Sequence, residues 1–293
     1  MVEHFAAPPG WEWWITLYFF TAGLAGGLYV LATIFRLRGT ARDESIARMG
    51  FMWAFPLVVL CGIFLTVDLG KPLDFWHMMI NTTPGEGGLN WKPWSPISLG
   101  TWGLLIFSIF SFVSFAFAWS MERRARAGAT DLAAPVFARI FNIVGSLAGL
   151  FLASYTGVVL SVSNQPVWSD SWAIGALFVV SGLSASAALM AWLGRSRADA
   201  SAEARLARAD GYFALLEALA LALFFVTLAM AGTLASTFHG LFWVLWILVI
   251  LSLLPPLRTL GARAPAAFST ASAFAVIVGV LLMRIAVIFS AQY

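Results

Sequence analysis

The chain has 293 residues, of which 61% are hydrophobic and 11% are charged, with a formal net charge of +3. A soluble domain carries about 25% charged residues, so this composition excludes a soluble protein and predicts an all-α integral membrane protein. The single cysteine, Cys61, excludes a disulfide, a cysteine-ligated cluster and a structural zinc site within the chain.

Eight apolar runs are long enough for helical membrane spans, which need about 20 residues each. Their length and lack of alternation argue against a membrane β-barrel. We expect them to divide into two four-helix bundles, within residues 1–165 and 166–293. The predicted spans are 14–34, 49–67, 97–119, 136–160, 172–193, 212–231, 241–254 and 267–289.

The first span begins with an aromatic cluster that includes Trp14 and is followed by Tyr18. Such residues are typical of the belt at a membrane surface. Further along this span, Gly23 and Gly27 have the GxxxG spacing that lets another helix approach closely.

A long loop, residues 68–96, follows the second span and contains four prolines. Loops of this length are usually functional or disordered. Its apolar patch LDFWHMMI, which includes His77, predicts a short helix lying in the membrane interface. Asp68 opens the loop, and two interpretations stay open for it: a local pair with Lys71, or a proton acceptor near the membrane surface.

The fourth span ends in SYTGVVLSVSNQPVW, where Tyr155 reaches the predicted membrane edge. Its phenol is either an interface anchor or a hydrogen-bond donor to a ligand carbonyl. Arg139 and Asn142 lie near the other end of this span, and Glu217 lies at a similar depth in the sixth. Buried charges are usually paired or functional, so an Arg139–Glu217 pair and a proton path are both open.

Arg284 lies near the end of the last span, where it either extends to the interface or balances Asp68. None of the three histidines lies in the middle of a span, so we expect no haem. A redox cofactor must then be diffusible or belong to a partner.

The basic residues predict the orientation of the spans, because positive charge is retained on the cytoplasmic side. Thirteen of the 17 lie in odd-numbered loops, so these loops are predicted to be cytoplasmic and both termini periplasmic. Tyr18, Asp68 and Tyr155 are then expected on one external face. The thirteen are Arg36, Arg38, Arg42, Arg48, Arg123, Arg124, Arg126, Arg195, Arg197, Arg205, Arg208, Arg258 and Arg263.

Three segments in this order resemble the NrfD/PsrC family of polysulfide-reductase-type membrane subunits: WITLYFFTAGLAGGLYVLA, DLGKPLDFW followed by SPISLGTW, and SYTGVVLSVSNQPVW. The resemblance implies a quinone-reactive subunit of the bacterial cytoplasmic (inner) membrane, without haem or iron–sulfur cluster of its own. It exchanges electrons between menaquinone or ubiquinone and a ferredoxin-like, four-cluster iron–sulfur subunit near the periplasmic face. A molybdenum-pterin catalytic subunit is the further expected partner besides the lipid bilayer, and no nucleic acid is expected.

The family's quinone-site tyrosine falls on Tyr155, and a histidine of the polysulfide reductase subunit is replaced by Tyr18. The family's acidic position after span two matches Asp68. Trp14 and His77 complete the quinone site that we predict. Either Asp68 handles protons at the outer face, or Glu217 and Arg139 admit them from the cytoplasm, with Asn142 and Arg284 as further candidates. No metal site is expected.

Two rival functions stay open at this point. A polytopic transporter fits eight helices with a few intramembrane charges, although paired Gly/Pro-interrupted spans in two halves are not evident. A passive membrane anchor without quinone chemistry is the other.

Overall fold

The computed structural model of the chain describes residues 9–38, 40–129, 134–195, 200–260 and 269–292. Within these ranges, eight helices are long and apolar enough to cross a membrane, which confirms the predicted all-α membrane fold. In chain order the elements are α1 (Trp13–Arg38), α2 (Ala41–Asp68), the 3-10 helix η1 (Pro72–Met78), β1 (Ile80–Asn81), β2 (Gly88–Leu89), α3 (Pro96–Arg126), α4 (Val136–Ser161), α5 (Ile174–Gly194), α6 (Ala200–Ala231), the 3-10 helix η2 (Leu234–Phe238), α7 (Phe242–Leu260) and α8 (Thr270–Phe289).

Several helices are longer than the membrane spans predicted for them, because their polar ends are also helical. The predicted span 49–67 lies within α2, and the helix begins earlier because Thr40 caps it by accepting a hydrogen bond from the Asp43 N–H at 3.1 Å. The polar segment ASAEARLARAD is part of α6. Helix α7 continues beyond the predicted span 241–254, through Pro255 and Pro256, whose fixed φ is compatible with a helix.

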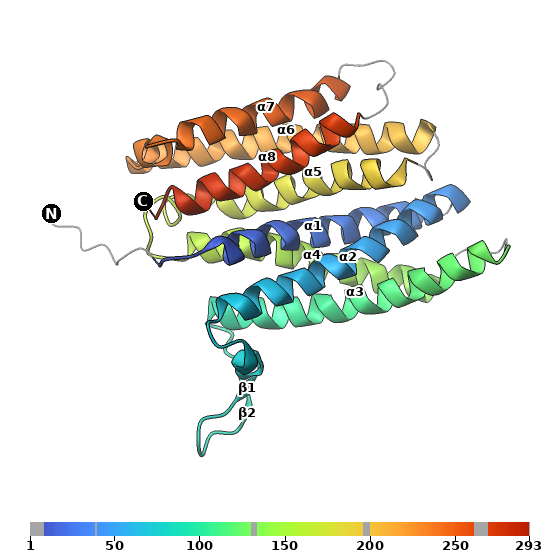
Figure 1. The fold of residues 1–293 in the computed structure, drawn as a ribbon, viewed down its shortest axis with the longest axis horizontal. Helices are drawn as coiled ribbons and strands as arrows, with labels where there is room; N and C mark the ends of the chain where they lie inside the picture. Colours follow the sequence, from blue (N-terminus) through green and yellow to red (C-terminus); the bar gives the residue numbers. More distant parts are fainter. Residues whose placement is uncertain (1–8, 39, 130–133, 196–199, 261–268, 293) are drawn as a thin grey trace.

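The long helices lie side by side, with α1 to α4 in one half of the molecule and α5 to α8 in the other (Figure 1). Helices α1 and α5 are central, because 78% of the apolar window of each is buried, compared with 28% for α2 and α3. Helix α1 packs on α5 as well as on α2 and α4, so it joins the two halves. Their division into separate bundles stays a prediction.

Glycines bring α1 into close contact with its neighbours. Gly23 and Gly27, the predicted GxxxG pair, face Gly182 of α5, where an added Cβ would lie 3.1 Å from the Gly23 Cα. On another side of α1, a Cβ added at Gly149 of α4 would lie 3.3 Å from the Gly26 Cα. The predicted close helix approach is confirmed, and side chains at these positions would push the helices apart.

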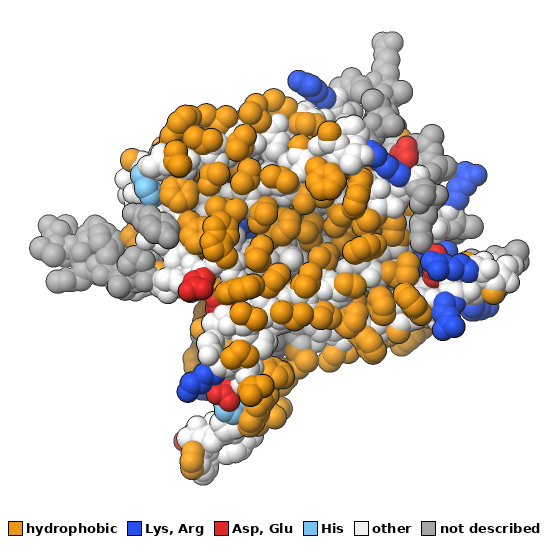
Figure 2. Space-filling view, in the orientation of Figure 1, with side chains coloured by type: hydrophobic (Ala, Val, Ile, Leu, Met, Phe, Trp, Pro, Cys, Tyr) orange, Lys and Arg blue, Asp and Glu red, His pale blue; other side chains and the backbone are white. Residues whose placement is uncertain are grey.

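We call the end of the molecule where α1 begins and α8 ends the outer end, and the opposite end the inner end. Figure 2 shows hydrophobic side chains over the middle of the helices and Lys and Arg side chains gathered at the inner end. This distribution agrees with a membrane around the middle, while the side of the membrane that each end faces stays a prediction.

Residues 69–95, which we call the arm, project sideways from the outer end (Figure 1). The predicted interfacial helix is the short 3-10 helix η1, and it is followed by a hairpin in which Ile80 pairs with Leu89. Asn90 fastens the arm to α3, because its carbonyl accepts a hydrogen bond from the Trp102 indole N–H at 3.3 Å. The base of the arm is thereby held against the outer ends of α2 and α3.

Candidate functional site

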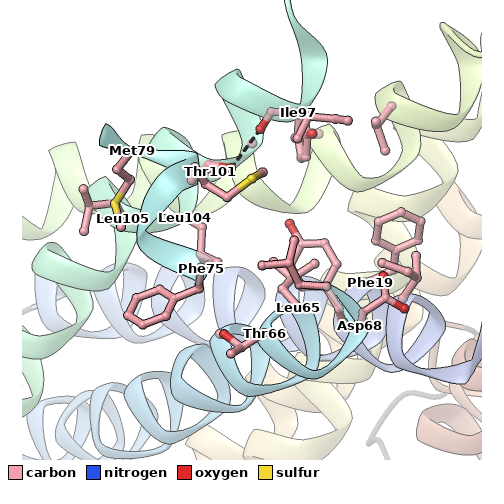
Figure 3. Close-up of a pocket in the computed structure, with 18 of the residues that line it drawn as sticks. Phe19, Leu65, Thr66, Asp68, Phe75, Met79, Ile97, Thr101, Leu104 and Leu105 are labelled. Atoms are coloured by element: carbon pink, nitrogen blue, oxygen red, sulfur yellow. Dashed lines mark hydrogen bonds between the residues drawn. The ribbon is translucent and has the colours of Figure 1, made fainter. Parts of the chain in front are cut away.

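A pocket of about 720 Å³ opens at the outer end between α1, α2, α3, α4 and η1. This volume is typical of a small-molecule site. Three of the predicted site residues line it from three different helices: Tyr18, Asp68 and Tyr155. Most of the remaining lining is apolar, and Figure 3 shows Leu65 on the α2 side of the cavity and Leu104 on the α3 side. The pocket therefore suits a largely apolar ligand that carries a few polar atoms.

Tyr18 presents its hydroxyl to this pocket. The residue is only 3% exposed, and its ring packs beside Phe19 with centroids 5.4 Å apart. Among the described residues, its hydroxyl has no hydrogen-bond partner. This hydroxyl is therefore available to a ligand in the pocket.

Tyr155 is held against the start of α3. Its hydroxyl donates a hydrogen bond to the Pro96 carbonyl at 2.7 Å, and its ring rests on Gly100, where an added Cβ would overlap the ring and the hydroxyl. Pro96 begins α3, so its carbonyl also lies in the hydrogen-bond ladder of that helix. Tyr155 can therefore transfer its hydrogen bond to a ligand without leaving a buried acceptor unpaired.

Asp68 is the last residue of α2 and lies exposed at the edge of the pocket. The pair with Lys71 that the sequence allows is not formed among the described residues. Glu12, another carboxylate, is close enough to interact with it electrostatically. Asp68 is thus an uncompensated carboxylate between water and the pocket, a position suited to proton exchange.

Two predicted quinone-site residues lie beside the pocket and not in its wall. Trp14 packs on Phe64 with ring centroids 6.0 Å apart, and the His77 ring contacts Trp76 at 4.0 Å. The pocket positions of the first segment are 11, 15, 18 and 19, which form a stripe next to the one that carries Trp14. Trp11 therefore lines the pocket where Trp14 was predicted to do so.

The turn after α4 positions Trp11. The indole of Trp11 stacks on Trp168, with ring centroids 4.9 Å apart. Trp168 is fully buried and donates a hydrogen bond to the Val287 carbonyl at 2.9 Å. The preceding residue, Val167, has a φ of 73°, which is rare for a β-branched residue, and its N–H is bound by Asp170 at 3.0 Å. The conformation of this turn thus fixes one wall of the pocket.

A buried charged cluster lies behind the pocket, formed by Arg284 of α8 with Glu217 and Asp210 of α6, and we call it the Arg284 cluster. Each residue is at most 1% exposed. Arg284 donates hydrogen bonds to the carbonyls of Phe178 at 2.9 Å and of Phe19 at 3.4 Å. Glu217 interacts electrostatically with Arg284 and Asp210. One oxygen of each acid has no hydrogen-bond partner among the described residues. Because Phe19 lines the pocket, the cluster reaches its rear wall.

A second buried polar cluster, which we call the Arg36 cluster, joins α1 to α4 in the inner half. Arg36 donates two hydrogen bonds to Glu44, at 2.6 and 3.1 Å, and a third to the side-chain carbonyl oxygen of Asn142 at 2.9 Å. The Asn142 amide nitrogen then donates to Tyr29 at 3.0 Å and to Ser114 at 2.7 Å. The side-chain polar atoms of Asn142 are therefore all used within a structural network.

Arg139 lies outside both clusters. It is half-buried, and its Nε has no partner among the described residues. The Arg139–Glu217 pair that the sequence allows is not formed, because Glu217 faces Arg284. The pair of Arg36 and Glu44 was not predicted, because both residues fall between the predicted spans 14–34 and 49–67. The acidic residues Asp43 and Glu44 in an otherwise basic loop were the available signal.

A known protein family matches this chain along a stretch that includes every element of the pocket. The sequence model of the family described as Polysulphide reductase, NrfD matches residues 3–293. The chain belongs to the NrfD family. The match extends over all eight helices, so the resemblance first seen in spans one to four holds for the whole NrfD-type chain.

Similar proteins include Protein NrfD of Escherichia coli K12, which is 27% identical over 305 residues, covering 96% of this chain and 95% of that protein. A second relative is one of the chains of the polysulfide reductase of Wolinella succinogenes, 28% identical over 186 residues, covering 60% of this chain and 55% of the relative. A third is one of the subunits of the selenate reductase of Mesobacillus selenatarsenatis, 25% identical over 113 residues, covering 39% of this chain and 24% of the relative.

Proposed function

We propose that this chain is the membrane subunit of a respiratory oxidoreductase complex and that it binds a quinone in the outer-end pocket. The observation that carries the proposal is the convergence of Tyr18, Tyr155 and Asp68 at one end of an otherwise apolar cavity. A quinone has two ring carbonyls and an apolar tail, which match this distribution of polar and apolar lining. The names of two relatives, which belong to a polysulfide reductase and to a selenate reductase, support membership in a reductase complex.

The chain's own residues bind the quinone and handle its protons, while the quinone itself supplies the redox chemistry. The Tyr18 hydroxyl donates a hydrogen bond to one carbonyl oxygen. The Tyr155 hydroxyl leaves the Pro96 carbonyl and donates to the other oxygen. Asp68 exchanges protons between the head group and water at the edge of the pocket.

Electrons pass between the quinone and a partner that docks at the outer end. The partner that we propose is a ferredoxin-like iron–sulfur subunit, with a molybdenum-pterin catalytic subunit beyond it. The arm supports this docking site, because it exposes Leu73, Trp91 and Trp94 beside the pocket. In this proposal the outer end faces the periplasm, and the membrane is the bacterial cytoplasmic membrane.

A second proton route leads through the Arg284 cluster. Asp210 and Glu217 are seven residues apart, which is two helical turns, so they lie on one face of α6. Their unpaired oxygens point to groups that exchange protons inside the membrane, where a lone buried charge is costly. Protons that follow this route from the inner end to the pocket would make turnover electrogenic, whereas protons exchanged through Asp68 would not.

The test measures quinol-dependent turnover in the purified complex for Tyr18→Phe and Tyr155→Phe. Each change removes one hydroxyl, and the loss of its hydrogen bond corresponds to about 0.5–1.5 kcal/mol, roughly two- to tenfold in kcat/KM. The matched control is Tyr212→Phe, because Tyr212 is exposed on α6, away from the pocket.

We expect both pocket variants to assemble normally and to lose turnover, with Tyr212→Phe unchanged. Normal turnover in both pocket variants would contradict a quinone head group at these tyrosines. An intact complex without any quinol-dependent turnover would support the passive anchor, and solute uptake by the chain alone would support the transporter.

A further inference from the structure

One wall of the outer-end pocket comes from a segment that is not helical. Trp11 lines the pocket two residues before α1 begins at Trp13. The backbone N–H and carbonyl of Trp11 therefore lie outside the hydrogen-bond ladder of the helix, and partly buried backbone groups need partners elsewhere. The position of the Trp11 ring thus depends on the contacts that this short segment makes with the rest of the molecule.

Gln292, which follows α8, supplies both partners. Its Oε1 accepts a hydrogen bond from the Trp11 N–H at 2.7 Å, and its Nε2 donates to the Trp11 carbonyl at 3.2 Å. One side chain thereby makes the same pair of bonds that two facing residues exchange in an antiparallel sheet. Nε2 also donates to the Ile288 carbonyl of α8 at 3.3 Å, which fixes the amide group to that helix. Gln292 thus clamps a segment that lies 281 positions away in the sequence.

The Trp11 indole belongs to a row of aromatic rings at the polar end of the pocket. Besides its stack on Trp168, the indole meets the Phe19 ring at 77°, with centroids 5.9 Å apart. Phe19 in turn packs beside Tyr18, whose hydroxyl faces the pocket. Aromatic rings attract one another in stacked or edge-to-face arrangements with centroids about 4.5–7 Å apart. A flat conjugated ring that accepts a hydrogen bond from Tyr18 would therefore find the indole within contact range.

The residue after Trp11 places this segment at the head-group end. Glu12 is close enough to Asp68 to interact with it electrostatically, and Asp68 lies at the edge of the pocket. Trp11 is thus near both the exposed carboxylate and the Tyr18 hydroxyl, where the polar groups of the pocket gather.

We infer that the Trp11 indole binds the ring of the quinone head group, and that Gln292 is the positioning residue that holds the indole in place. The inference rests on the proposed function, because the ring is that of the quinone. Gln292 follows α8, whereas the residues that line the pocket come from α1 to α4, η1 and their flanking segments. The second half of the molecule thus completes a site that the first half builds.

Four variants test the two roles. Trp11→Leu removes the indole, and Trp11→Phe keeps a smaller aromatic ring. Gln292→Ala removes both hydrogen bonds to the Trp11 backbone, whereas Gln292→Glu keeps the acceptor and removes the donor. The matched control is Trp13→Leu. Trp13 is 56% exposed and does not line the pocket, but its ring packs on Phe289 of α8 at 4.8 Å, so the control also removes an aromatic contact with α8.

The measurement is kcat and KM, determined separately for the purified complex with a short-tailed quinol. We expect Trp11→Leu to raise KM by about tenfold with kcat nearly unchanged, because the contact with the ring exists before and during the reaction. Trp11→Phe should raise KM by about threefold, since part of the aromatic contact remains. Gln292→Ala should raise KM by about three- to tenfold and Gln292→Glu by less, while Trp13→Leu leaves both constants unchanged.

The double variant Trp11→Leu/Gln292→Ala separates positioning from a general structural role. Where the indole is already absent, the loss of Gln292 should raise KM by less than about twofold, because no ring is left to position. A residue that only stabilised the fold would change the kinetics by the same factor in both backgrounds.

An unchanged KM in Trp11→Leu, or a lower kcat without a higher KM, would overturn the assignment of the indole to the head group. Equal effects of Gln292→Ala with and without the indole would overturn its positioning role. If Trp11→Leu or Gln292→Ala fails to assemble, Trp11→Phe and Gln292→Glu decide by the same criteria. If Tyr18→Phe slows turnover while Trp11→Leu does not, the proposed function stands and this inference fails. If the unmodified complex oxidises no quinol, the proposed function itself fails.

Discussion

The position of Tyr155 depends on the absence of a side chain at Gly100, which makes Gly100→Ala a sharp test of the pocket. The added methyl would overlap the Tyr155 ring and hydroxyl, so the ring must move by about 1.3 Å or more to reach van der Waals contact. Such a shift lengthens the 2.7 Å hydrogen bond to the Pro96 carbonyl beyond the usual limit. The expected cost in stability is about 1–3 kcal/mol, the range for an extra methyl group in a packed site.

In the purified complex, we expect Gly100→Ala to lower kcat/KM for quinol by about tenfold while assembly persists, because the lost hydrogen bond and the displaced ring act together. The control is Gly145→Ala, since a Cβ at Gly145 would overlap the Tyr29 hydroxyl and ring in the same way, inside the Arg36 cluster. That variant should lose a similar amount of stability, read from thermal unfolding in detergent, and keep its quinol kinetics.

A double-mutant cycle shows whether Gly100 acts through Tyr155. Tyr155→Leu removes the ring atoms that the methyl would overlap, so Gly100→Ala should cost much less in that background. The expected coupling energy is about 0.5–3 kcal/mol, as for residues in contact. Unaltered stability and kinetics in Gly100→Ala, or strict additivity in the cycle, would refute the packing of Tyr155 on Gly100.

Three further variants test the polar groups. Asp68→Asn should lower kcat with little change in KM, because it removes a proton acceptor and keeps the shape of the pocket; an unchanged kcat would assign proton exchange elsewhere. Glu217→Gln should abolish the membrane potential formed during turnover in proteoliposomes, with Glu86→Gln in the arm as control; a normal potential would argue against the inner proton route. Arg36→Met should lower the unfolding free energy by about 3–5 kcal/mol by leaving a buried carboxylate uncompensated. The exposed Arg126→Met should cost about 1 kcal/mol or less, and equal losses would contradict the buried pair.

Much of the fold follows from local properties of the chain. Apolar runs of about 20 residues identify membrane spans without any knowledge of their neighbours, and all eight predicted spans correspond to helices. The helix ends were less predictable, as the start of α2 and the end of α7 show, because hydropathy marks the bilayer and not the extent of the helix. A capping residue such as Thr40 decides where the backbone begins to be helical.

Only some of the residues that line the pocket could be predicted from the sequence. The predicted orientation of the spans placed Tyr18, Asp68 and Tyr155 at the same end of the molecule. In the structure all three line a single cavity. It leaves out Trp14, because α1 is apolar on every side and its sequence does not specify which stripe faces which neighbour. The rotation of a helix about its axis is decided by close packing, here by Gly23 and its neighbours on α5.

The sequence by itself determined that this protein spans a membrane eight times and that several of its unusual polar residues cluster at one end, since both depend on composition along a local stretch. Only the tertiary structure decided which residues meet. Glu217 of α6 faces Arg284 of α8, and Arg36 of α1 pairs with Glu44 of α2. Charged side chains buried among membrane-spanning helices are costly unless they are paired. Which residue pairs with which depends on the helices that pack together, and that packing is determined by the whole sequence.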